Sequence, residues 1–168
     1  MENLQTDYKK QCALHGLVLG LYSSFLLWLT YKFNFDDNIL MSFISIAVAV
    51  FLVYYPIHQF KINNDNILKI GDALKIGLII GVVSGLVYGF YTYYHYISVD
   101  TEFIPNTIEE SRKALELQKN DMPEEQYEQA KGMTETMVSP FLFATFGLFT
   151  LLFKSFIIAL VIGLIKKK

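Results

Sequence analysis

Apolar residues in this chain gather in long blocks rather than alternating with polar ones. A helix needs roughly 20 residues of this kind to cross about 30 Å of hydrocarbon. Blocks of about that length cover 12–31, 39–57, 73–96 and 140–165. No cluster of turn residues interrupts any of them, and Pro56 and Pro140 stand at block ends, where a helix tolerates proline best. The pattern predicts an all-α membrane protein with a bundle of four transmembrane helices.

The third block carries a glycine at every fourth position: Gly77, Gly81, Gly85 and Gly89. On a helix this spacing stacks the glycines on one face. In water each would weaken the helix by roughly 1 kcal/mol relative to alanine, whereas in lipid the backbone has no alternative to the helix. The bare face lets another helix approach closely. We expect packing in the manner of a glycine zipper.

The first block repeats the four-residue step with Gly16 and Gly20. Small residues at this spacing on two helices favour close helix–helix contact. We therefore expect the third block to lie centrally in the bundle and to touch the first block, the fourth block or both. The alternative is that its glycines face outward and drive dimerisation.

Lysines flank the blocks unevenly. Eight lysines are expected on one side of the predicted bundle: Lys9, Lys10, Lys61, Lys69, Lys75, Lys166, Lys167 and Lys168. The opposite side has Lys32 close to a block, and the other cations there stand mostly far from a block end. Because short positively charged flanks stay on the cytoplasmic side, we expect both termini in the cytoplasm. We also expect the first block to remain as a span, because it is longer than the apolar part of a secretory signal.

The segment 98–139 is predicted to form an extracytoplasmic helical hairpin between the third and fourth spans. Its acidic residues outnumber its basic ones, which the overall net charge of -2 conceals. Thr107 as N-cap and Glu110 three residues later match a capping box, which predicts a helix from Thr107 to about Asn120. A second helix start follows at 121–124. The hairpin is either a solvated acidic surface or a docking surface for an outer partner.

Lys154 is the most informative single side chain, because it stands near the middle of the fourth block. A central lysine costs roughly 3 kcal/mol on insertion scales, and no Asp or Glu occurs inside any block to pair with it. It either extends toward the membrane surface, or lines a polar cavity with Ser84 and Tyr88, or takes part in proton or ion movement.

The sequence contains no recognisable enzyme motif. It has no phosphate-binding loop, no G-x-S-x-G, no H-E-x-x-H and no carboxylate pair within the blocks. Cys12 and His15 share one helical face, but the other two histidines are expected elsewhere, so we expect no metal site. We accordingly expect no enzyme, no catalytic residue and no cofactor. The basic residues flank membrane spans, so we expect no nucleic-acid partner.

The third block and the residues that follow it resemble those of a known family. The stretch 71–77, Gly-Asp-Ala-Leu-Lys-Ile-Gly, opens the third block, 91–94, Tyr-Thr-Tyr-Tyr, closes it, and Asp100 and Phe103 follow. This is similar to an uncharacterised family of small bacterial membrane proteins, domain-of-unknown-function family 4199. The resemblance implies four spans, a long acidic loop before the last span, and a location in the bacterial cytoplasmic (inner) membrane. It implies no activity, cofactor or catalytic residue.

Two functional hypotheses follow. The first is a non-enzymatic multi-pass membrane protein acting as a structural, accessory or sensory subunit. The second is a small transporter or channel component with a polar path near Lys154. An intramembrane enzyme ranks third, because the blocks contain no acid–base pair. The expected partners are the lipid bilayer and either a second copy of the chain or another membrane protein.

Overall fold

The structure is a computed structural model that describes residues 2–33 and 39–167. Within these ranges all the regular elements are helices: α1 (Glu2–Phe33), α2 (Ile39–Asn63), α3 (Ile70–Ser98), α4 (Phe103–Leu117), the short 3-10 helix η1 (Lys119–Asp121), α5 (Glu124–Met137) and α6 (Pro140–Lys166). Four of them, α1, α2, α3 and α6, are long and apolar enough to cross a membrane. The all-α prediction with four candidate spans is confirmed. Most of the gap between the first two predicted blocks, 34–38, lies outside the described residues.

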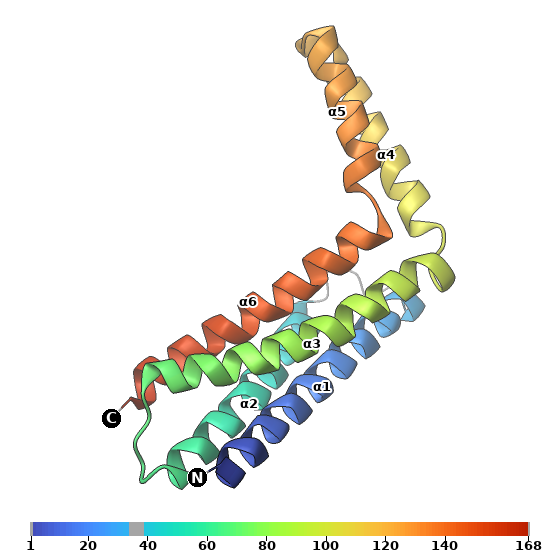
Figure 1. The fold of residues 1–168 in the computed structure, drawn as a ribbon. Coiled ribbons are helices and arrows are strands. Elements are labelled where there is room, and N and C mark those ends of the chain that lie inside the picture. Colours follow the sequence, from blue (N-terminus) through green and yellow to red (C-terminus); the bar gives the residue numbers. More distant parts are fainter. Residues whose placement is uncertain (1, 34–38, 168) are drawn as a thin grey trace.

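The four long helices lie side by side, with α3 between α1 and α6 (Figure 1). α1 and α3 begin, and α2 and α6 end, at the same end of the bundle. We call this the lysine end, because Lys61 and Lys166 meet there. At the opposite end the chain leaves the bundle after α3 and returns at α6, so the intervening helices project away from it.

Burial follows this arrangement. Small and medium side chains of α2, α3 and α6 form most of the core, including Ala49, Val53, Ala73, Ile80 and Ala159. Large apolar side chains point outward along the same helices, among them Phe43, Phe90 and Phe153. An apolar exterior of this extent is typical of a surface that contacts membrane or another protein. The four helices therefore have the interior and exterior expected of a membrane bundle.

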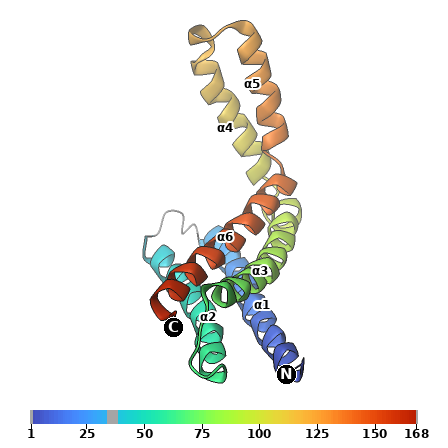
Figure 2. The same cartoon turned by 60° about the vertical axis from the view of Figure 1, so that its left-hand side comes forward.

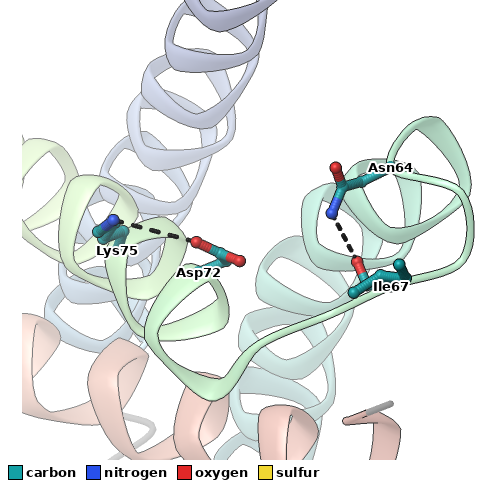
Figure 3. A network of polar contacts seen from close by, with 4 residues as sticks. All are labelled: Asn64, Ile67, Asp72 and Lys75. Atoms are coloured by element: carbon teal, nitrogen blue, oxygen red, sulfur yellow. Dashed lines mark hydrogen bonds and ion pairs between the residues drawn. The ribbon is translucent and has the colours of Figure 1, made fainter.

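A tight turn joins α2 to α3 at the lysine end. Asp65 and Asn66 take positive φ angles of 50° and 59°, which Asn and Asp adopt more readily than most residues. The Asn64 side-chain amide donates to the Ile67 carbonyl at 2.9 Å and closes the turn (Figure 3). The turn reverses the chain so that α3 runs antiparallel to α2.

α4 and α5 lie side by side and form what we call the arm, residues 103–137 (Figure 2). The capping box predicted for its first helix is wrong. α4 begins at Phe103, and Thr107 lies inside it, with its hydroxyl donating to the Phe103 carbonyl at 2.7 Å. α4 also ends at Leu117 rather than near Asn120, and α5 begins at Glu124.

Candidate functional site

The glycine row of α3, Gly77, Gly81, Gly85 and Gly89, faces α6. A Cβ atom placed on Gly77 would overlap the Cβ of Ala159, and one on Gly85 would lie 2.8 Å from the Leu148 carbonyl oxygen. At Gly89 the nearest atom would be the Ala144 carbonyl oxygen, at 3.1 Å. These neighbours are mainly backbone atoms, which cannot rotate away. The two helices are therefore in close contact along the row, in the geometry that small residues permit within a bilayer.

The other side of α3 faces α1 in the same way. A Cβ on Gly16 would lie 2.8 Å from the Ile80 carbonyl oxygen, and one on Gly20 would lie 2.9 Å from that of Ser84. In this structure both sets of glycines are thus covered within a single chain. α3 is the central helix, and its position fixes those of α1 and α6.

The three residues predicted to share a polar cavity make separate contacts. The Lys154 ammonium donates to the Ser45 hydroxyl of α2 at 3.4 Å. Ser84 is buried in α3 and donates to the Gly81 carbonyl at 3.2 Å. Tyr88 packs its ring against Gly147 of α6. Lys154 is therefore turned toward α2, and Ser45, which the sequence did not single out, is its polar neighbour.

A second polar contact between α2 and α6 lies at the lysine end. The Lys166 ammonium donates to the Tyr54 hydroxyl at 2.7 Å and lies 3.5 Å from Nδ1 of His58. The Lys61 ammonium of α2 donates to the Lys166 carbonyl at 3.0 Å. This hydrogen bond satisfies one of the last carbonyls of α6, which have no partner within the helix. The sequence identified these lysines only as topology signals, because the pairing depends on how two distant helices are aligned.

An aromatic junction of Tyr96, Phe103 and Phe143 joins the arm to the bundle. The Tyr96 and Phe103 rings are stacked with centroids 4.5 Å apart, and Phe143 contacts each of them at 5.5 Å. Each residue comes from a different helix, α3, α4 or α6. Side-chain stacking therefore holds the base of the arm against the bundle.

His95 directly precedes Tyr96 of this junction and is almost fully buried, with 1% of its surface exposed. The rings of Tyr31 and Tyr96 meet it edge-on at 5.3 and 5.4 Å. Within the described part of the chain, its Nδ1 and the hydroxyl of nearby Thr92 have no hydrogen-bond partner. This end of α3 therefore contains a buried polar side chain, His95, as well as the exposed tyrosines Tyr93 and Tyr94.

The arm has little interior of its own. Tyr127 is its buried side chain among those described, and the Lys119 ammonium lies 4.8 Å from that ring. On α4 the Glu109 carboxylate accepts from the Lys113 ammonium at 2.6 Å, which lowers the pKa of Glu109 and raises that of Lys113. Leu117 is 85% exposed, and Met133 and Met137 are also exposed. The arm thus presents apolar side chains on an acidic surface.

Metal-binding side chains do not cluster: across residues 2–33 and 39–167, no group of three or more His, Cys, Asp or Glu residues could hold an ion. His15 instead stacks on Tyr55 of α2 at 5.6 Å, and its Nδ1 lies 2.8 Å from the Gln11 carbonyl oxygen. The shared face of Cys12 and His15 is therefore used for helix packing.

The model of one protein family, described as Protein of unknown function (DUF4199), matches residues 14–168. The chain belongs to this family, which confirms the resemblance seen in the sequence. Comparison with the curated proteins gave no match, and neither did comparison with the solved structures.

Proposed function

We propose that this family member is a non-enzymatic, multi-pass protein of the bacterial cytoplasmic membrane that presents the arm to a partner outside the cell membrane, as an accessory or sensory subunit. The observation that carries the proposal is the position of the arm. It projects from the end of the bundle opposite the lysine end (Figure 1). Because clustered lysines favour the cytoplasmic side, the arm belongs on the outer side.

Two features of the arm support a partner. Its surface is acidic and carries Leu117, Met133 and Met137, each of them more than half exposed. Its base is fixed by the aromatic junction, so that the arm is held away from the bundle. An acidic surface with apolar anchors fits a partner surface that is basic and apolar. The partner is a second membrane protein or another copy of this chain.

Cysteine labelling tests the orientation. Cys12 is the chain's one cysteine, so Cys12→Ser gives a background without thiols. In that background we expect Glu116→Cys to react with a membrane-impermeant maleimide in intact cells and Lys167→Cys to react only after permeabilisation. Labelling of both positions, or of neither, in intact cells would refute the orientation and with it the outer location of the arm.

Photocrosslinking tests the partner. We expect a photoreactive residue at Leu117 to give one discrete adduct in cells, whose mass distinguishes a second copy from another protein. The matched control is Phe90, which is exposed to a similar degree on α3 but lies within a span. The same adduct from both positions would indicate random neighbours in the membrane and would contradict a role for the arm.

A further inference from the structure

A cleft of about 450 Å³ opens at the lysine end of the bundle, where α1, α2 and α3 meet. Its volume falls within the roughly 300–1,000 Å³ typical of small-molecule sites. The side chains that line it are Tyr8, Lys9, Phe60, Asp72, Lys75, Leu78 and Ile79. Most of the lining is apolar, and charged groups from two different helices accompany it. The cleft therefore suits a ligand with a long apolar part and a charged part.

The charges favour an anion. Lys9 and Lys75 both line the cleft, against the single carboxylate of Asp72. Asp72 and Lys75 pair one turn apart on α3, at 4.0 Å and with most of the lysine side chain exposed (Figure 3). An exposed pair at this distance neutralises little of either charge. The lining therefore has an excess of positive charge.

Tyr8 forms part of the wall of the cleft. Its ring packs against Phe60 with centroids 5.0 Å apart, which fixes its position. Its hydroxyl is buried beside the buried thiol of Cys12, a weak acceptor, so the hydroxyl belongs to the packed interior of the bundle. The aromatic side chains of Tyr8 and Phe60 therefore give this side of the cleft an apolar wall that suits an acyl chain.

We propose that this cleft binds one phospholipid with an anionic headgroup. The phosphate lies between Lys9 and Lys75, and one acyl chain runs along the side chains of Tyr8, Leu78 and Ile79. The site stands at the end of the spans, where lipid headgroups are found. The inference does not depend on the function proposed for the arm, nor on which side of the membrane the lysine end occupies.

The test is native mass spectrometry of the protein released from nanodiscs of equal phosphatidylglycerol and phosphatidylcholine. We expect the protein to retain one phosphatidylglycerol selectively. Replacing both cleft lysines, Lys9→Gln with Lys75→Gln, should lower that selectivity at least tenfold. The matched control, Lys10→Gln with Lys69→Gln, removes the same charge from the same end outside the cleft lining, and should change the selectivity less than twofold.

Equal losses in the two double variants would show diffuse attraction between lysines and the membrane, and would overturn the site. Equal retention of the two lipids by the unmodified protein would do the same. Displacement of the lipid by excess inorganic phosphate would show that the acyl chain contributes nothing to binding, and would overturn the proposal of a phospholipid site. If the protein with Lys9→Gln and Lys75→Gln does not fold, Leu78→Trp tests the proposal instead, because it fills the cleft without changing the charge. It should abolish selective retention, and retention at the original level would refute the proposal.

Discussion

Gly85 in the bundle and Gly132 in the arm both lie inside a helix, but their surroundings are opposite. Gly85 of α3 faces the backbone of α6, whereas a Cβ on Gly132 of α5 would meet nothing within 4 Å. In lipid there is no hydrophobic force between apolar helices, so close backbone contact holds them together. The arm is held instead by side chains such as Tyr127 and by its aromatic junction. The same residue type therefore permits close helix contact in one region and is surrounded by open space in the other.

The largest effect is expected from filling the contact between α3 and α6. Gly85→Leu would force its side chain against the Leu148 carbonyl, and we expect it to lower the free energy of unfolding by about 3 kcal/mol. Reversible unfolding in mixed micelles measures this change.

The arm supplies the control for that experiment. Gly132→Ala adds a methyl group where there is open space and removes a glycine from a helix interior, so it should raise the stability of α5 by up to about 1 kcal/mol. Equal destabilisation by Gly85→Leu and Gly132→Ala would contradict the contrast between the two regions.

The next largest effect concerns Lys154. Since a central lysine costs roughly 3 kcal/mol and its bond to Ser45 is long, Lys154→Leu should raise bundle stability by about 1–2 kcal/mol, as measured by the same unfolding experiment. Ser45→Ala, which removes only the acceptor, should change it little. A Lys154→Leu protein less stable than the original would instead support a hydrated polar path through the bundle.

A change of similar size should separate the arm from the bundle. Phe103→Ala removes two ring contacts of the aromatic junction, each worth about 0.5–1.5 kcal/mol. We expect faster hydrogen exchange throughout 103–137 and no change in exchange of α3. Phe149→Ala, an exposed phenylalanine of α6, is the control and should leave the arm unaffected. Faster exchange in α3 would show that the two regions unfold together.

The smallest effect is a pH dependence confined to the arm. Lys113 lowers the pKa of Glu109, so the stabilisation of α4 by this pair is complete at neutral pH. It is lost as the pH falls through the pKa of the folded state, which lies below the ordinary value of about 4.3. Carboxyl NMR titration should show the pKa of Glu109 rising in Lys113→Gln. An identical titration in both proteins would mean that the pair does not form in solution.

Much of the bundle could be predicted because its signals are local. Each span is encoded by a continuous apolar block, and the positions of the glycines show which face of α3 is bare. The register between helices is not local. Lys154 meets Ser45, and Lys166 meets Tyr54, only because α2 and α6 lie next to each other across more than a hundred residues of chain.

The start of the arm shows the opposite error, in which a local signal was misleading. Thr107 and Glu110 match a capping box, but the helix already begins at Phe103. Tyr96 and Phe143 hold the Phe103 ring, and this contact favours an earlier start than side-chain capping would give. Residues distant in the chain thus determined a boundary that the adjacent residues indicated wrongly.

The central place of α3 has a consequence for how the protein is made. The ribosome completes α3 before it begins α6, and the whole arm is synthesised between them. At about 5–20 residues per second, several seconds pass in which the glycine row has no α6 to cover it. The nascent chain must therefore keep this row against lipid tails, or against α1 and α2 alone, until its last helix arrives.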